Sequence, residues 1–448
     1  MIVLFLLVGV IATLIGLVVL RWPVVGLYMG VALSGVLMAP DLPFVGVRLA
    51  APDVPLLLAL VGLLMRSALS RRVPSVGAGP VRWALSVFLF FLFVALLSFL
   101  FNAVFRDVDA LNSFIEVSSY FYGFLLACAT IILLNDWNRW RTFVAFWLVG
   151  VAAVSFISVL AIIGLAPEWA YHGGGRIKST AHSVNQLHSY LAPAIPMLVG
   201  LFIIKSNKRL LNLLPFGVIV SVVLALSVTG SRTAFVLFAF VLLASIWYSL
   251  RYFTKYPLAS TYGVLLLGGL SCVSGYYLFL VATMGVEVLP EGMRAIARPF
   301  ERSVMVAGLT DYLGARGEQL TIILENLRYT MFLGVGPGNF MEVFDHRHSV
   351  HSTYLGVLIE VGWFGLLLLL FALGLVIRQG YRFSPKINND DQSLLMIMAL
   401  ISVITVCIYG VATFGLRQRI FWLLIGMLLA AVNISASERR SQFVIRGH

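Results

Sequence analysis

Residues 83–105 have the sequence WALSVFLFFLFVALLSFLFNAVF, which contains no charged side chain. The run is long enough to cross a bilayer as a helix, which takes about 20 apolar residues, whereas a spanning β-strand takes about half as many. Similar runs recur along the chain and predict an all-α polytopic membrane protein with about 12 transmembrane helices. The runs cover residues 2–20, 24–39, 48–65, 83–105, 111–134, 142–165, 188–204, 210–229, 233–250, 259–284, 351–377, 393–413 and 419–435.

The composition excludes an ordinary soluble protein. Of the 448 residues, 60% are hydrophobic and only 11% are charged, whereas soluble domains contain about 25% charged residues. The first apolar run lacks a basic leader and is followed by a second run, so it predicts a transmembrane helix and not a cleaved signal peptide. The three cysteines show no CxxC spacing and no HExxH motif is present, so we expect neither a metal nor a cofactor.

The basic residues predict an orientation and an anion site. Clusters of Lys and Arg flank alternate connections, which are therefore predicted to be cytoplasmic. Of the 31 Lys and Arg residues, thirteen fall on the opposite side, and twelve of these are arginines. The planar guanidinium group suits phosphate and carboxylate oxygens. We therefore expect an anion site on the outward face, where Arg417 and Arg419 would contact either a diphosphate or lipid headgroups.

Two outward connections are long, residues 166–187 and residues 285–350. The second mixes apolar and charged residues at helical spacing, which predicts amphipathic helices that lie on the membrane face.

A glycine-rich turn and a histidine precede one apolar helix. The turn, residues 334–338, leads through a polar segment to His351, after which Glu360 is the one acid of the helix. A helix start favours the neutral imidazole that can act as a base, and glycine lets backbone approach a ligand. This arrangement suits proton transfer. His346 and His348 are competing candidates, for which the alternative is a solvated loop position. For His182 and His188 the alternative is to cap a helix or to bond a backbone carbonyl.

Three arginines are candidates for binding the anion. Arg232 opens an apolar helix, where a guanidinium costs about 2–3 kcal/mol unless it faces a cavity or a partner, or snorkels to the interface. Arg176 follows three glycines and precedes a polar run that contains Asn185, and Arg316 heads the segment that leads to the glycine turn. The alternative for Arg176 and Arg316 is a solvated surface position.

At these residues the chain resembles the bacterial O-antigen ligase and polymerase family. The resemblance covers about residues 170–435 and includes Arg176 before a segment with Asn185. The other matching motifs are Ser231-Arg232 at a helix start, a GxGxxxF turn at residues 334–340, His351-Ser352-Thr353-Tyr354-Leu355, and the Glu-x-Gly-x-x-Gly segment at residues 360–365.

This resemblance implies a GT-C-like, metal-independent glycosyltransferase on the periplasmic face of the bacterial inner membrane. The donor would be a glycan on undecaprenyl diphosphate. Arg176, Arg232 and Arg316 would bind the diphosphate, and His351 would orient or deprotonate the acceptor hydroxyl, with inversion at the anomeric carbon. Additional candidates for the site are Asn185, His188, Tyr354, Glu360, Arg417 and Arg419.

The resemblance also divides the chain. Residues 1–165 would form a transmembrane scaffold, residues 166–435 the catalytic region with its periplasmic loop 285–350, and residues 436–448 a cytoplasmic tail. The favoured activity is ligation of O-antigen to lipid A–core, and the alternative is a polymerase that joins lipid-linked repeat units. A transporter of an anionic lipid or sugar is less favoured because no repeated halves are evident. Membrane lipids are expected partners and nucleic acids are not.

Overall fold

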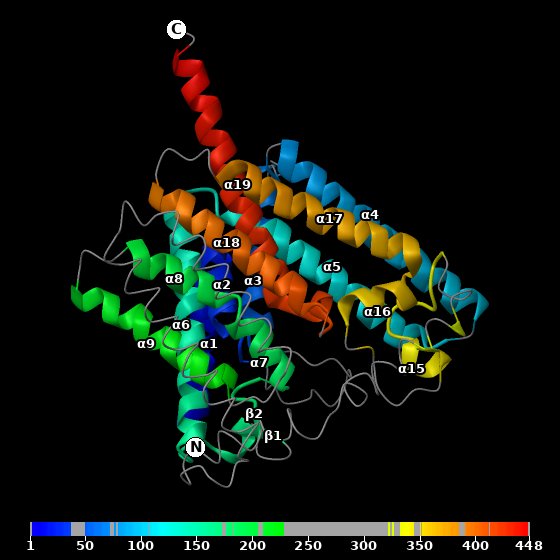
Figure 1. Cartoon of the computed structure of the whole chain (residues 1–448), viewed down its shortest axis with the longest axis horizontal. Helices are drawn as coiled ribbons and strands as arrows, with labels where there is room; N and C mark the ends of the chain where they lie inside the picture. The colour runs from blue at the N-terminus through cyan, green and yellow to red at the C-terminus, as the bar shows by residue number, and fades with distance from the viewer. Residues whose placement is uncertain are drawn as a thin grey trace, which may run out of the picture.

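The computed structural model describes residues 2–36, 50–71, 76–77, 79–106, 108–172, 176–181, 183–204, 209–227, 321–322, 325–326, 332–344, 350, 352–384, 390–411 and 413–446. Almost all secondary structure in these ranges is helical (Figure 1). They contain eight helices that are long and apolar enough to cross a membrane, or nine spans if a bent pair counts as one. The predicted class, an all-α polytopic membrane protein, is confirmed.

The predicted number of about 12 spans stays a prediction. The apolar runs at residues 233–250 and 259–284, and nearly all of the loop at residues 285–350, lie outside the described residues.

The N-terminal part begins with a bent pair of helices. α1 (Ile2–Arg21) and α2 (Pro23–Leu33) meet at Trp22 with a bend of 119°. Pro23 lies in the first turn of α2, where a missing N–H is tolerated, whereas it could not continue α1 without loss of a hydrogen bond. α3 (Asp53–Ser70) packs against both helices.

Three long helices follow, α4 (Gly79–Phe105), α5 (Ala110–Leu133) and α6 (Trp137–Ile162). The Asp109 carboxylate accepts hydrogen bonds from two backbone N–H groups in the first turn of α5, and Asp136 accepts one in α6. These N-caps fix the helix starts. They explain why α6 begins five residues before the apolar run at 142–165, since the cap sets the start and not the hydropathy.

The connection at residues 166–187 contains short elements. A 3-10 turn, η1 (Glu168–Ala170), precedes a two-residue antiparallel pair, β1 (Tyr171–His172) and β2 (Arg176–Ile177). α7 (Val184–Leu191) and α8 (Ala194–Ile204) together form one span, and α9 (Arg209–Ser227) follows.

The apolar run at residues 351–377 is not one helix. It divides into α16 (Thr353–Glu360) and α17 (Gly362–Phe383). Gly362 has φ of 90°, and a Cβ there would collide with the carbonyl oxygen of Phe332. Glycine adopts this backbone conformation without penalty, which allows the break. A short helix, α15 (Phe340–Val343), precedes the break, and α18 (Asp390–Tyr409), η4 (Gly415–Arg417) and α19 (Arg419–Arg446) follow it.

Four helices form the part of the bundle that carries the glycine turn. α17 packs along α4, and α19 packs along α5 (Figure 1). Gly123 of α5 faces the indole of Trp422 on α19, where an added Cβ would collide with the ring. Small residues allow such close helix approach in membranes. Large apolar side chains such as Phe90 and Phe101 are exposed on the outside, as expected for a surface that faces lipid.

Candidate functional site

The glycine turn is built against the C-terminal end of α16. Gly334, Gly336 and Gly338 have φ of 62°, 90° and 82°. The N–H groups of Val335 and Gly336 donate to the carbonyl oxygens of Ile359 and Glu360, at 2.9 and 3.0 Å. These are carbonyls that the break after α16 leaves without helical partners. The close approach that the glycines permit is therefore to the protein's own backbone.

Polar side chains of α4 and α5 hold the other side of the turn. Ser98 of α4 donates to the carbonyl oxygens of Leu333 and Glu360. On α5, Asn112 donates to Gly338 O at 2.8 Å and Ser113 donates to Pro337 O at 2.7 Å. Arg106, just beyond α4, donates to Gly334 O at 3.2 Å. The turn is thus fixed by helices from the first third of the chain.

The N-terminal end of α16 is fixed by the loop between α18 and α19. The N–H of Thr353 donates to Gly410 O and Thr413 O, at 2.7 and 3.1 Å. Its hydroxyl donates to Thr413 O at 2.7 Å and accepts from the N–H of Gly415 at 2.6 Å. Ser352 is the N-cap and accepts from Leu355 N. The start of α16 is therefore fixed by the loop that follows α18 and by the first residue of η4.

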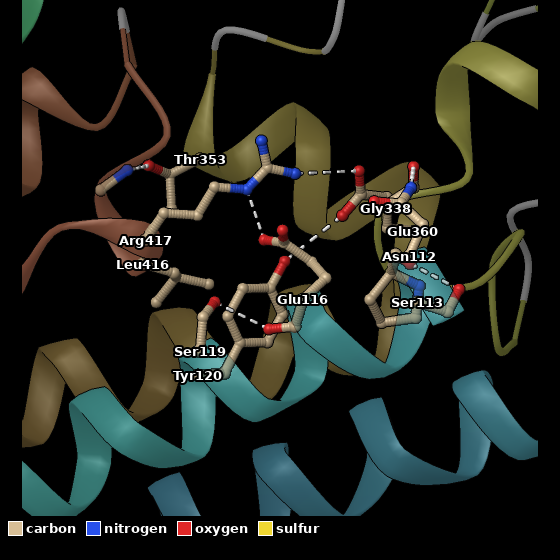
Figure 2. A network of polar contacts seen from close by, with 12 residues as sticks. Asn112, Ser113, Glu116, Ser119, Tyr120, Gly338, Thr353, Glu360, Leu416 and Arg417 are labelled. Atoms are coloured by element: carbon tan, nitrogen blue, oxygen red, sulfur yellow. Dashed lines mark hydrogen bonds and ion pairs between the residues drawn. The ribbon is translucent and has the colours of Figure 1, made fainter. Parts of the chain in front are cut away.

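An ionic cluster joins α5, α16 and η4 (Figure 2). Arg417 donates from Nε to Glu116 of α5, and its Nη2 lies 3.9 Å from the Glu360 carboxylate. The hydroxyl of Tyr120 donates to the other oxygen of Glu360 at 3.3 Å. The guanidinium carbon lies 4.4 Å from the centre of the Phe414 ring, which adds a cation–π contact. We call Arg417, Glu116, Glu360 and Tyr120 the ionic cluster.

Burial shifts the pKa of Glu360, one of the two acids of this cluster. The side chain of Glu360 is 2% exposed, and this desolvation raises the pKa of Glu360 to about 7, although Arg417 opposes the shift. For Arg417 the balance is reversed: burial disfavours the charged guanidinium, but Glu116 and Glu360 raise its pKa above the ordinary value. Arg417 therefore stays charged, whereas Glu360 can change its protonation state near neutral pH.

Arg419 has a different partner. Its Nε and Nη2 donate to the two carboxylate oxygens of Asp53, at 2.8 and 2.6 Å. Asp53 also accepts from Tyr122 and from the N–H of Ala50. Its side chain is 2% exposed, against 25% for Arg419. This bidentate pair ties the start of α3 to the start of α19.

The other predicted site residues that the structure describes lie on several different elements. The hydroxyl of Tyr354 donates to Cys407 O at 2.6 Å, so it attaches α16 to α18. His188 is fully buried in α7, and its Nε2 lies 3.4 Å from Leu226 O. Asn185 lies at the start of α7 and is half-buried, and the backbone of Arg176 pairs with His172 in the β1–β2 hairpin.

Four predicted residues lie outside the described part of the chain, namely His182, Arg232, Arg316 and His351. The structure therefore brings Glu360 and Arg417 together but does not test a convergence of His351 with Arg176, Arg232 and Arg316. Its described residues contain no group of three or more His, Cys, Asp or Glu side chains that could hold a metal ion.

The sequence interpretation missed Glu116, Asp53 and Thr353. Glu116 and Asp53 lie inside predicted apolar runs, at 111–134 and 48–65. An acid inside a membrane span normally pairs with a partner, so both could have been proposed as partners of the outward arginines. Thr353 gave no such signal because its role depends on the path of a distant loop.

The described part of the chain contains eight helices, or up to nine spans, that could cross a membrane. The ion pairs of Arg417 and Arg419 lie at one end of these spans. Together these features define a polytopic membrane protein with a polar site at the ends of its spans. Residues 216–370, about a third of the chain, match the family model described as O-antigen ligase. This match supports the O-antigen ligase/polymerase family for that part of the chain. No curated protein matches the chain. The match supports, in general terms, a glycosyltransferase-like activity of the ligase or polymerase type on lipid-linked glycans.

Proposed function

We propose that the protein transfers a glycan from undecaprenyl diphosphate to an acceptor hydroxyl on the periplasmic side of the bacterial inner membrane. The observation that carries the proposal is the O-antigen ligase match, which spans Arg232, Arg316 and His351. The favoured acceptor is lipid A–core, which makes the reaction O-antigen ligation in lipopolysaccharide synthesis. Joining of lipid-linked repeat units by a polymerase is the alternative.

In the proposed reaction, the acceptor oxygen attacks the anomeric carbon and the bond from that carbon to the diphosphate oxygen breaks, with inversion. His351 takes the proton of the acceptor hydroxyl as general base. Arg176, Arg232 and Arg316 stabilise the negative charge that develops on the leaving diphosphate, the role that a metal ion has in many other transferases.

The fixed position of α16 supports this proposal. A catalytic side chain needs a rigid support, and the helix that follows residue 351 is bonded at its start to the α18–α19 loop and at its end to the glycine turn. Val350 and Ser352, on either side of residue 351, are both buried. The support is therefore present in the described part of the chain.

The test is a transfer assay with purified full-length protein and a lipid-linked donor, with and without lipid A–core. We expect glycosylated core as the product, and we expect His351→Ala and Arg232→Ala to abolish transfer while both variants elute as folded protein in detergent. Near-normal transfer by either variant would remove that residue from the mechanism. Extension of the glycan without the core would identify a polymerase.

A further inference from the structure

The ionic cluster places two carboxylates against one guanidinium, and the two contacts differ. Arg417 donates a direct hydrogen bond to Glu116, whereas the Glu360 oxygen lies 3.9 Å away, beyond hydrogen-bond range. The Arg417 side chain is 34% exposed, against 12% for Glu116 and 2% for Glu360. An anion that arrives from the exposed side can therefore replace Glu360 as a partner of Arg417 without displacing Glu116.

We propose that Arg417 binds a phosphate group of an anionic ligand, and that Glu360 takes up one proton from solvent when the ligand replaces it. The reason is the burial of Glu360. A buried carboxylate that loses its counter-charge is strongly destabilised, and protonation is the usual response. The proton would end on a carboxylate oxygen of Glu360, and Arg417 would stay protonated and pair with Glu116 and the phosphate.

The groups around Glu360 are compatible with both of its protonation states. Among the described residues, the titratable or charged groups that face it are Arg417 from η4, and Glu116 and Tyr120 from α5. The backbone of Gly338 in the glycine turn also favours the charged form and lowers the pKa of Glu360. A hydroxyl can donate to a carboxylate and accept from a carboxylic acid, so Tyr120 can bond either form. Burial raises the pKa of Glu360, which favours the protonated form once Arg417 has another partner.

The phosphate could come from two sources, the diphosphate of the glycan donor or the headgroup of a membrane phospholipid. That the source is the donor rests on the proposed function, whereas the proton-linked binding at Arg417 does not. Two probes separate the sources: inorganic pyrophosphate and a soluble short-chain phosphatidylglycerol.

The experiment is a calorimetric titration of the full-length protein in detergent at pH 6 to 8, in two buffers that differ in ionisation heat. We expect wild-type affinity to fall by up to about tenfold per pH unit above pH 7, because the bound state holds one proton more than the free state. Glu360→Gln should lose this dependence, and the difference between the two proteins cancels the titration of the ligand itself. Glu342→Gln is the matched control, since Glu342 lies exposed on α15 and bonds only Asp109 N among described residues.

Proton-linked binding of pyrophosphate supports the donor as the source, and linkage with phosphatidylglycerol alone supports a lipid headgroup. If wild type and Glu360→Gln show the same pH dependence with both probes, the inference is overturned. If Glu360→Gln does not fold, sulfate replaces pyrophosphate, because neither sulfate nor phosphatidylglycerol titrates in this range and proton uptake by wild type then decides. Glycan transfer without proton-linked binding rejects this inference alone, and proton-linked binding without transfer rejects the proposed function alone.

Discussion

Asp53 and Arg419 show how a single buried ion pair can tie distant parts of the chain together. Arg419 donates two hydrogen bonds to the Asp53 carboxylate across 366 positions of sequence, and the Asp53 side chain is almost fully buried. From the sequence alone, an arginine at a helix end could pair with several kinds of partner, among them a substrate and a lipid. The structure assigns an internal carboxylate to it, because a buried charge has to be compensated.

We predict that Asp53→Asn destabilises the protein substantially. Breaking a buried pair while leaving one charge in place costs about 3–5 kcal/mol. Thermal unfolding in detergent should therefore shift clearly downward. The matched control is Asp136→Asn, because the Asp136–Arg139 pair is about half exposed on both sides, at 49% and 46%, and such pairs contribute only about 0–1 kcal/mol. Equal shifts for the two variants would contradict the assigned role of Asp53.

At the scale of elements, α16 depends on partners at both of its ends. Thr353 makes four hydrogen bonds to the α18–α19 loop, and two backbone bonds join the end of α16 to the glycine turn. A short helix of this kind gains little stability from its own hydrogen bonds. Its position, and that of the residue before its N-cap, is therefore set by the neighbouring loops.

We predict that Thr353→Val lowers kcat for glycan transfer by tenfold or more, with a smaller change in KM, since it removes the hydroxyl at nearly constant volume. The change leaves Thr413 O and the N–H of Gly415 without this partner, and each lost bond in a buried site costs about 1–3 kcal/mol. Thr353→Ser keeps the hydroxyl and should restore transfer. Steady-state kinetics of the three proteins test this. A proportional loss by Thr353→Ser would show that the methyl group, and not the hydroxyl, matters.

The sequence predicted several elements well and others poorly, for physical reasons. Hydropathy located α4 and α5 because a lipid-facing helix has to be apolar over its whole length. It missed the break at Gly362, because one glycine in an apolar run has no effect on hydropathy. Glu360 and Arg417 were predicted as candidate site residues, but Glu116, the second acid beside Arg417, was not, since pairing across 301 positions depends on helix packing.

At the scale of the molecule, the bonds to the glycine turn, the ionic cluster and the Asp53–Arg419 pair gather at one end of the spans. The end of α4 lies beside α15 and α16 (Figure 1), and Arg106, just beyond α4, donates to Gly334 O. α5 starts at this end, and α6 begins at Trp137, just after the other end of α5. The basic clusters predict that the first end is periplasmic.

Site-specific labelling tests this orientation. We predict that Met341→Cys reacts with a membrane-impermeant thiol reagent added outside intact spheroplasts, whereas Asn138→Cys reacts only after the membrane is opened. Both positions are exposed, Met341 on α15 and Asn138 in the first turn of α6. The native cysteines should be replaced by alanine in both proteins. Labelling of both positions from outside would reject the orientation.

The hydrogen bonds from α4 and α5 to the glycine turn limit how the protein can be re-engineered. The family match at residues 216–370 includes the turn and α16, but Ser98, Asn112 and Ser113, which donate hydrogen bonds to them, belong to the hairpin of α4 and α5. A chimera that receives only residues 216–370 from a relative would combine the relative's turn with the side chains of α4 and α5 from this protein, which do not match it. A transplant that is meant to change acceptor specificity should therefore carry α4 and α5 together with the domain.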